Sequence, residues 1–311
     1  MSGRLIVVAG PTATGKTRLG IELARHLNGE IVSADSMQVY RGMDIGTAKA
    51  SPEERAEAVH HLLDVADPWE DYSVSRYVHD ASLVCDRLLA AGKTPIVVGG
   101  TGLYIDSLIA GREFSGRQDG DEALRRELNA DYDRLGGEAM RERLRAFDPE
   151  RAEKLHPADR RRIVRAIEVY RLTGRTISQH DAETRARPKR YEALRLVLNY
   201  ADRADLYARI DRRVDEMLAA GLFEEVAGLL AAGLSAESTA MQAIGYKEAA
   251  RALAGEISRS EAAEQIKQNS RRYAKRQLTW FGREKDAHWI IWEKQPDFDA
   301  ALRQAEALLS T

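Results

Sequence analysis

The chain has 311 residues, of which 44% are hydrophobic and 31% are charged, and its formal net charge is -2. This length gives room for one large domain or about two of ordinary size, and either arrangement can bury a core without disulfide bonds. The composition is that of an ordinary soluble protein, and no apolar run is long enough to span a bilayer. The near-neutral net charge argues against extensive non-specific binding to nucleic acid.

The start of the chain and its cysteine content indicate a cellular compartment. Residues 1–4, MSGR, lead straight into an apolar run and show no signal-peptide pattern. The single cysteine, Cys85, cannot form an internal disulfide bond and lies in an apolar pattern, which predicts a packed thiol. We therefore expect a cytoplasmic protein without thiol chemistry.

The N-terminal third alternates strands and helices. The pattern predicts strands at residues 4–9, 29–34 and 94–100, helices at residues 16–27 and 75–91, and further strands at residues 194–200 and 288–294. Continuous apolar strands that alternate with helices are typical of a parallel sheet covered on both faces. We therefore expect an α/β fold.

The middle of the chain has a different pattern. Between residues 115 and 191 the strand signal disappears and a helical periodicity rich in Arg and Glu replaces it. This predicts an all-helical domain, residues 115–191, inserted into a sheet core made of residues 1–114 and 192–311. From residue 203 the pattern is again helical, and the expected helix ends are Gly221, Gly233 and Gly255.

The octapeptide GPTATGKT, residues 10–17, joins the first strand to the first helix and fits the pattern G-x-x-x-x-G-K-T. In this setting the glycines let backbone N–H groups surround an anionic oxygen, Lys16 adds a point charge, and Thr17 can offer its hydroxyl to Mg²⁺. The motif predicts a sheet core of the P-loop NTPase type that binds a phosphate. The alternative is a chance loop of similar sequence without a ligand.

Two other polar residues follow strands of the expected sheet. An ordinary kinase or ATPase has an Asp at the end of a second strand that helps to hold Mg²⁺, but here that strand ends in GGTG, residues 99–102. Asp35 instead follows the strand at residues 29–34. Since ligands bind at the carboxyl ends of parallel strands, Asp35 and Thr101 should both face the crevice that the phosphate loop opens. Asp35 is then a candidate Mg²⁺ ligand, directly or through water, or a proton acceptor, and the alternative is a helix N-cap.

Five segments together resemble the tRNA dimethylallyltransferases, also called tRNA isopentenyltransferases or the IPP transferase family. The segments are VAGPTATGKT (8–17), SADSMQVYRGMDIGTAK (33–49), HHLLDVADPWEDYS (60–73), VVGGTGLYI (97–105) and AIGYKE (243–248). The resemblance covers nearly the whole chain, to about Trp280. It implies transfer of a dimethylallyl group from dimethylallyl diphosphate to N6 of the adenosine at tRNA position 37, next to the anticodon, with release of diphosphate.

The resemblance also implies roles for individual residues. The diphosphate and the cofactor Mg²⁺ would be held by Gly10, Thr12, Ala13, Thr14, Gly15, Lys16 and Thr17, with Thr17 as a possible Mg²⁺ ligand. Asp35 would accept a hydrogen bond from the N6 amine and act as its base, and Thr101 would lie near the reacting centre. Contacts with the anticodon stem-loop of tRNA are implied for Asp35, Ser36, Met37, Gln38, Asp159, Arg160, Arg161, Arg162, Ile163, Lys275, Arg276 and Gln277.

Two segments carry positive charge that suits RNA. Residues 159–190 contain ten Lys and Arg against four Asp and Glu, on a chain whose total charge is -2. In residues 264–280, Lys267, Arg271 and Lys275 recur at helical spacing. A solvated helix surface is the alternative for residues 159–190. In residues 264–280 the alternative is structural, since acidic residues near the start of the helix and basic ones near its end would also suit the helix dipole. The family usually has Arg after TWF, whereas this chain has Gly282 and then Arg283, so one phosphate contact of the family is either missing here or moved by one residue.

Two other functions are compatible with the sequence. A small-molecule or nucleoside kinase would use the same loop on ATP and would not need RNA. A non-catalytic RNA-binding module would bind tRNA in a salt-dependent manner and form no product. We expect a monomer, because the sequence has no long heptad pattern and no flat exposed strand. We expect no membrane partner, because no apolar run is long enough to span a bilayer.

Overall fold

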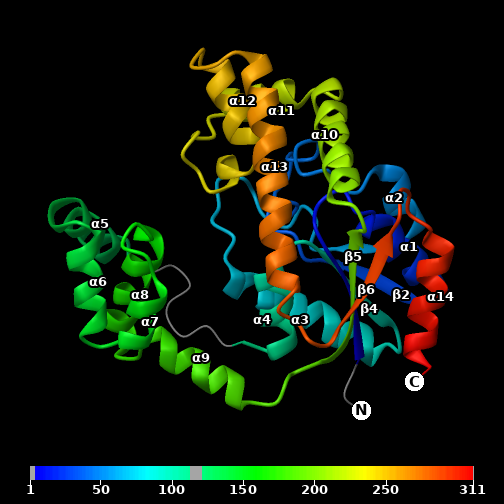
Figure 1. Cartoon of the computed structure of the whole chain (residues 1–311), viewed down its shortest axis with the longest axis horizontal. Coiled ribbons are helices and arrows are strands. Elements are labelled where there is room, and N and C mark those ends of the chain that lie inside the picture. The colour runs from blue at the N-terminus through cyan, green and yellow to red at the C-terminus, as the bar shows by residue number, and fades with distance from the viewer. Residues whose placement is uncertain (1–3, 113–120, 311) are drawn as a thin grey trace. The chain divides into compact units, whose positions relative to one another are not determined.

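The computed structural model describes residues 4–112 and 121–310 (Figure 1). Six strands form one sheet in the order β3-β2-β4-β1-β5-β6, and every neighbouring pair is parallel. The strands are β1 (Arg4–Ala9), β2 (Gly29–Ser33), β3 (His60–His61), β4 (Thr94–Gly99), β5 (Glu192–Tyr200) and β6 (Ala287–Trp292). The predicted α/β fold with a parallel sheet is confirmed. The sequence did not predict β3, because two histidines are too short a segment to show a period.

The chain divides into two compact units. The first consists of Met1–Ile109 and Tyr191–Thr311, and the second is Ala110–Arg190. The first unit contains the sheet and α1 (Lys16–His26), α2 (Pro52–Glu57), α3 (Val74–Ala90), α4 (Gly102–Ala110), α10 (Arg203–Ala219), α11 (Leu222–Ala231), the short 3₁₀ helix Ala240–Gln242, α12 (Tyr246–Leu253), α13 (Arg259–Phe281) and α14 (Phe298–Leu309).

The second unit is helical. It contains α5 (Glu122–Leu135), α6 (Gly137–Arg145), α7 (Pro149–Lys154), α8 (Arg160–Thr173) and α9 (Ile177–Ala186). Its own core contains buried side chains from four of these helices, among them Leu128, Met140, Ala152 and Ile163. The domain limit that we expected between residues 114 and 115 lies outside the described residues.

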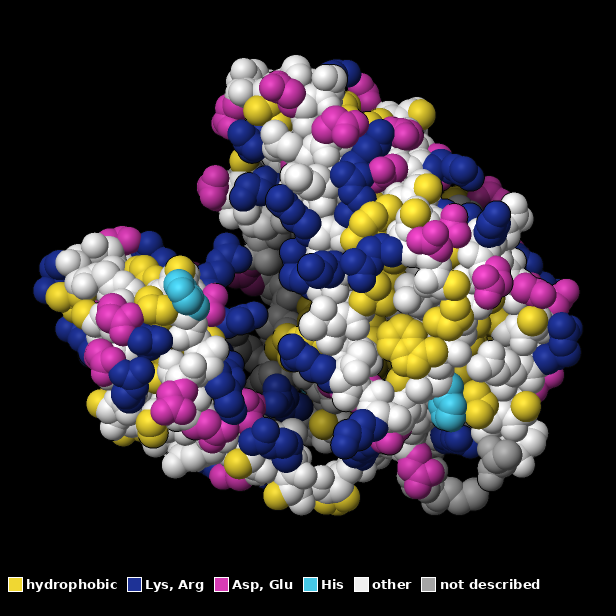
Figure 2. All heavy atoms as spheres, in the orientation of Figure 1, with side chains coloured by type: hydrophobic (Ala, Val, Ile, Leu, Met, Phe, Trp, Pro, Cys, Tyr) yellow, Lys and Arg dark blue, Asp and Glu magenta, His cyan; other side chains and the backbone are white. Residues whose placement is uncertain are grey.

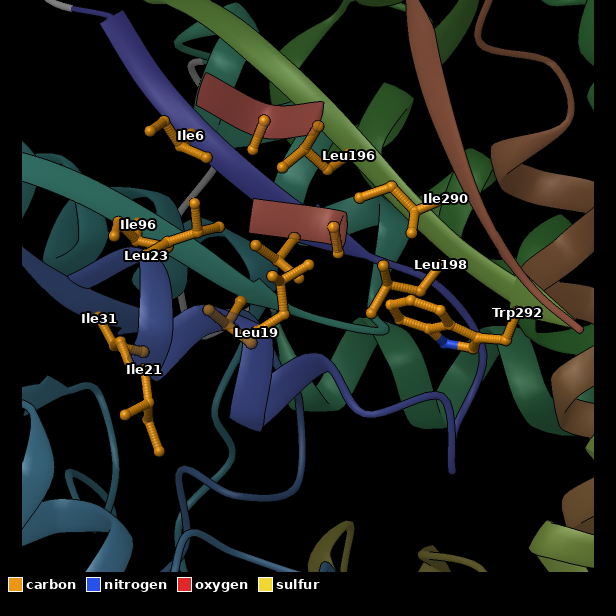
Figure 3. Close-up of a cluster of buried hydrophobic side chains, with 14 of the residues drawn as sticks. Ile6, Leu19, Ile21, Leu23, Ile31, Ile96, Leu196, Leu198, Ile290 and Trp292 are labelled. Carbon is orange, nitrogen blue, oxygen red and sulfur yellow. The ribbon is translucent and has the colours of Figure 1, made fainter. Parts of the chain in front are cut away.

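The sheet core forms because the residues of β1 from Leu5 to Ala9 are all apolar and all buried. Alternate residues of a strand point to opposite faces, so such a strand must be covered on both. Ile6 belongs to a cluster that includes Leu19 of α1, Leu196 of β5 and Trp292 of β6 (Figure 3). On the other face, α3 packs against β2 and β4. Cys85 of α3 is fully buried there, as the packed-thiol interpretation predicted.

Glycines end three helices as the sequence indicated. Gly221, Gly233 and Gly255 follow α10, α11 and α12 with positive φ angles of 102°, 89° and 77°. A residue without a side chain adopts this conformation at little cost. Over residues 4–112 and 121–310, none of the helices is both long enough and apolar enough to cross a membrane.

Candidate active site

Residues 10–17, here called the phosphate loop, connect the end of β1 to the start of α1. Ala13 and Gly15 have positive φ angles of 65° and 84°, so the backbone turns sharply before the helix begins. The Thr14 hydroxyl donates to Pro11 O at 2.8 Å, and the Trp292 indole N–H donates to Thr14 O at 2.9 Å. The loop is therefore held in shape by its own atoms and by β6, and it ends where the N–H groups of α1 favour an anion.

Two cations lie at this loop. Lys16 Nζ donates to Pro11 O at 2.7 Å, and burial together with the charge of Arg213 lowers the pKa of Lys16 to about 7. Arg213 comes from α10, where burial also lowers its pKa, and the Asp35 carboxylate opposes this shift for both cations. Because two close positive charges repel each other, the pair is suited to a multiply charged anion.

Asp35 follows β2 and faces this cationic pair. Its Oδ1 accepts from the backbone N–H groups of Met37 at 2.9 Å and Gln38 at 3.3 Å. The cap-like geometry considered from the sequence is therefore present, although residues 36–38 form a turn rather than a helix. In the described chain Oδ2 makes no hydrogen bond, so this oxygen is available to accept a proton.

Thr101 lies beside Asp35 because β2 and β4 are neighbours in the sheet. Its N–H donates to Ala34 O at 3.2 Å, and its Oγ1 accepts from the N–H of Ser36 at 3.1 Å. The Tyr273 hydroxyl of α13 lies near the Thr101 side chain, and burial followed by the Asp35 charge raises the pKa of Tyr273 to about 12. The structure thus brings together the two residues predicted as catalytic and adds a neutral phenol that the sequence did not single out.

The turn after Asp35 contains three predicted tRNA contacts with different surroundings. The Gln38 amide donates to Thr47 O at 3.1 Å and Ala48 O at 3.3 Å, so it is engaged inside the protein. Ser36 and Met37 are partly exposed. The side chains of Ser36 and Met37 are thus better placed than that of Gln38 to meet an external ligand.

Thr17 lies in the first turn of α1. It lines a cavity of about 20 Å³ together with Ser33, Gln38 and His60, which gives room for one water molecule. In the described part of the chain its hydroxyl has no hydrogen-bond partner. Mg²⁺ commonly binds through one or two protein oxygens, substrate phosphates and several waters, and the position of Thr17 fits one such oxygen.

The first half of the basic stripe on α13 is structural. Lys267 Nζ lies 2.7 Å from Asp215 of α10, and Arg271 forms an ion pair with Asp211 of the same helix. These two pairs fasten α13 to α10, so their charges are already compensated.

The second half of the stripe is different. Arg272, Lys275 and Arg276 are exposed, and Figure 2 shows Lys and Arg side chains gathered over α13. The Arg276 guanidinium lies 5.5 Å from the centre of the Tyr273 ring. Gln277, by contrast, is only 5% exposed. The side chains of Lys275 and Arg276 are accessible to RNA, whereas that of Gln277 is not.

The predicted tRNA-binding segment of the helical unit also separates into two groups. Arg160 forms an ion pair with Asp133 at 2.6 Å and hydrogen-bonds to Asn129, both on α5. Ile163 is fully buried in the core of this unit. Arg160 therefore joins two helices, and a side-chain contact between Ile163 and an external ligand is ruled out by its burial.

The remaining residues of that segment are accessible to different degrees. Arg161 and Arg162 are exposed at the start of α8. Arg162 lies 3.9 Å from Asp159, a separation at which an exposed ion pair is weak. Asp159 is half-buried and accepts from the backbone N–H of His156 at 3.2 Å. The two arginines are the candidates here for contact with a phosphate backbone.

Two functional candidates besides Tyr273 were missed by sequence reasoning. Arg209 and Arg213, one helical turn apart on α10, both point to site loops: Arg209 Nε lies 3.4 Å from Ala13 O and Arg213 lies 3.5 Å from Ala48 O. The only local signal was their spacing of four residues, which the neighbouring Arg212 obscures.

Comparisons with known proteins add independent evidence. A family model described as IPP transferase matches residues 38–284, and one described as Isopentenyl transferase matches residues 3–64. A tRNA dimethylallyltransferase of Geobacter metallireducens is 49% identical over 300 residues, which cover 96% of this chain and 95% of the relative. A tRNA dimethylallyltransferase of Acetivibrio thermocellus is 46% identical over 307 residues, covering 99% and 97%.

Solved structures are similar over the same length. The full-length tRNA isopentenylpyrophosphate transferase of Bacillus halodurans is 39% identical with a TM-score of 0.72, covering 99% of this chain and 95% of that one. A eukaryotic dimethylallyltransferase acting on tRNA is 30% identical with a TM-score of 0.84, covering 99% and 80%. Sequence and structure thus agree along almost the entire chain. The chain belongs to the IPP transferase family.

Proposed function

We propose that this chain is a tRNA dimethylallyltransferase. It transfers the dimethylallyl group of dimethylallyl diphosphate to N6 of the adenosine at tRNA position 37 and releases diphosphate. The observation that carries the proposal is the convergence of a phosphate loop with Lys16 and Arg213 on one side and Asp35 with Thr101 on the other. The phosphate loop with its two cations suits an anionic leaving group, and the Asp35 side suits an amine that loses a proton.

The phosphate loop serves the leaving group. When the allylic C–O bond breaks, negative charge grows on the diphosphate, and fixed N–H groups and cations stabilise that charge. Lys16 and Arg213 supply two cations, and burial makes their interaction with an anion strong. The other residues proposed to hold the diphosphate are Gly10, Thr12, Ala13, Thr14, Gly15 and Thr17.

Mg²⁺ is part of this proposal. Thr17 would hold it, and Asp35 would reach it only through water, since Oδ1 is hydrogen-bonded to the backbone and Oδ2 is left for the proton. When bound, the metal ion would neutralise charge on the diphosphate oxygens. The chain itself orients the dimethylallyl diphosphate, because Lys16 and the N–H groups of the phosphate loop hold its phosphates.

Asp35 and Thr101 serve the nucleophile. The N6 amine forms a new bond to the allylic carbon, the C–O bond to diphosphate breaks, and the amine must give up one proton. Oδ2 of Asp35 receives this proton, while Oδ1 is kept in place by Met37 and Gln38. An aromatic amine is a weak nucleophile, so placement contributes more than base strength.

The tRNA is proposed to bind through its anticodon stem-loop. A base whose amine reacts must leave the stack and enter a pocket, while basic side chains hold the backbone. Exposed Arg272, Lys275 and Arg276 on α13 and exposed Arg161 and Arg162 on α8 are suited to this role. We propose that the protein acts as a monomer in the cytoplasm.

The proposal is tested by mass spectrometry of nucleosides from unmodified tRNA. One reaction contains the protein, Mg²⁺ and dimethylallyl diphosphate, and a parallel reaction contains ATP in place of the prenyl donor. We expect prenylated adenosine in the first reaction alone. A phosphorylated product that requires ATP would support the kinase alternative, and salt-dependent tRNA binding without product would support a binding module.

A matched pair of variants links the product to the site. Lys16→Ala should raise the KM for the prenyl donor and lower kcat, because it removes a cation from the leaving group. Lys285→Ala removes an exposed lysine outside the site and should leave both constants unchanged. Equal kinetics for the two variants would remove the phosphate loop from the mechanism.

A further inference from the structure

One buried amide on α13 touches two separate loops of the proposed site. Gln277 Oε1 accepts from the N–H of Thr12 in the phosphate loop at 3.1 Å, and Gln277 Nε2 donates to Gly100 O at 2.9 Å. Gln277 lies far along the chain from both loops, so only tertiary packing brings them together. A glutamine is suited to this place, since one side chain must accept on one side and donate on the other.

A second side chain of α13 lies at the same junction. Tyr273 lies four residues before Gln277, on the same face of the helix. Its hydroxyl lies near the side chains of both Thr101 and Gln277. The two hydrogen bonds of Gln277 thus join α13 to the phosphate loop and to the loop at residues 99–102, and Tyr273 lies beside them.

The packing around Gly100 leaves little freedom at this junction. A Cβ added at Gly100 would lie 2.1 Å from Gln277 Nε2, and one added at Gly102 would lie 2.3 Å from the Trp280 ring. Trp280 is itself fixed by its indole N–H, which donates to Asp106 Oδ2 at 2.7 Å. The glycines of the GGTG segment thus allow α13 to pack directly against the loop that contains Thr101.

Resting on the function proposed above, we propose that Gln277 is a positioning residue rather than a tRNA contact. It fixes the phosphate loop, which holds the leaving group, relative to the loop of Thr101, which lies at the nucleophile. The distance between the two partners of the reaction is then set by one buried amide. A misplacement of about 1 Å between reacting groups costs on the order of a hundredfold in rate.

The first test needs no activity. Hydrogen exchange followed by mass spectrometry compares the parent protein with Gln277→Leu and with Gln268→Leu, a control at an exposed position of the same helix. We expect amides of residues 10–17 and 99–102 to exchange at least about tenfold faster in Gln277→Leu only, because Thr12 N–H loses its acceptor. Unchanged exchange in both segments would overturn the proposal.

The second test separates positioning from RNA contact. In single-turnover reactions with saturating donor and tRNA, Gln277→Leu should react roughly a hundredfold more slowly. Its Kd for unmodified tRNA, from filter binding, should stay within about twofold of the parent. A weaker tRNA affinity with an unchanged rate at saturation would instead identify Gln277 as an RNA contact.

A conservative variant covers the case in which Gln277→Leu does not fold. Gln277→Glu keeps an acceptor for Thr12 N–H but loses the donor to Gly100 O. We expect fast exchange at residues 99–102 and near-parental exchange at residues 10–17, and no change in either segment would again overturn the proposal. If the parent protein itself forms no prenylated adenosine, the proposed function fails while the exchange result still decides the positioning role.

Discussion

Glu225 of α11 has a structural role whose loss can be measured. Its carboxylate accepts from three successive backbone N–H groups, those of Asp44 at 2.9 Å, Ile45 at 2.8 Å and Gly46 at 3.2 Å. The Tyr246 hydroxyl also donates to it. The turn held in this way continues into Thr47 and Ala48, whose carbonyl groups bind the Gln38 amide. We therefore predict that Glu225→Gln destabilises the protein.

The size of this effect follows from the geometry. Asp44 and Ile45 share Oε2, whereas Gly46 and Tyr246 share Oε1. A glutamine retains one oxygen, so either pair keeps an acceptor and the other pair faces an NH₂ group. One unsatisfied donor costs about 1–3 kcal/mol, and the lost charge assistance adds to it. The expected loss is about 3 kcal/mol, which corresponds to a decrease in Tm of about 6–12 °C for a unit of this size.

Thermal unfolding followed by circular dichroism measures this decrease. The matched control is Glu224→Gln, the adjacent residue, which is exposed and lies 3.8 Å from Arg259. A surface pair of this kind contributes at most about 1 kcal/mol, so its Tm should change by no more than about 4 °C. Equal Tm values for the two variants would refute the claim that Glu225 stabilises this turn.

Three further predictions concern the donor site, a tight contact and pH. Arg213→Met should weaken binding of dimethylallyl diphosphate about 10- to 100-fold in calorimetry, and an unchanged Kd would place Arg213 outside that site. Gly46→Ala should lower Tm, because its Cβ would lie 2.4 Å from the Tyr246 ring; an unchanged Tm would show that the turn adapts. The hydrogen bond from Lys93 lowers the pKa of Glu30 from 4.5. The ionised Glu30 carboxylate therefore stabilises the folded state above pH 4.5, and this contribution is lost as pH falls through the lower pKa of the folded state. Glu30→Gln should therefore be less stable than the parent at pH 7 in urea unfolding, and a difference that persists in strong acid would contradict this.

Much of the sheet could be predicted because its signals are local. β1 and β4 are apolar runs, and the phosphate loop follows β1 directly. β3 was missed because its two histidines have no periodicity, and its pairing with β2 depends on the tertiary fold. The order of strands also depends on long-range packing, which a local pattern does not contain.

The candidate site could be predicted only where its residues follow strands. That Asp35 and Thr101 lie close together could be predicted, because strand ends share one edge of a parallel sheet. Arg213 could not be predicted as a site residue, because α10 contains several arginines and only the packing of this helix shows which of them reaches the site. Arg160 belongs to an equally basic segment, yet its partner Asp133 comes from another helix. Charge along the sequence cannot show which arginines are already paired.

The role of Asp35 as the proton acceptor is tested most directly by the single-turnover rate of Asp35→Asn on unmodified tRNA at saturating donor. Asparagine keeps an oxygen for the N–H groups of Met37 and Gln38, so the turn should survive, but it lacks the charged oxygen that receives the N6 proton. We expect a rate about 10²- to 10⁴-fold below the parent, with the Kd for tRNA nearly unchanged. Prenylation at a rate close to that of the parent would contradict the assignment of Asp35 as the base.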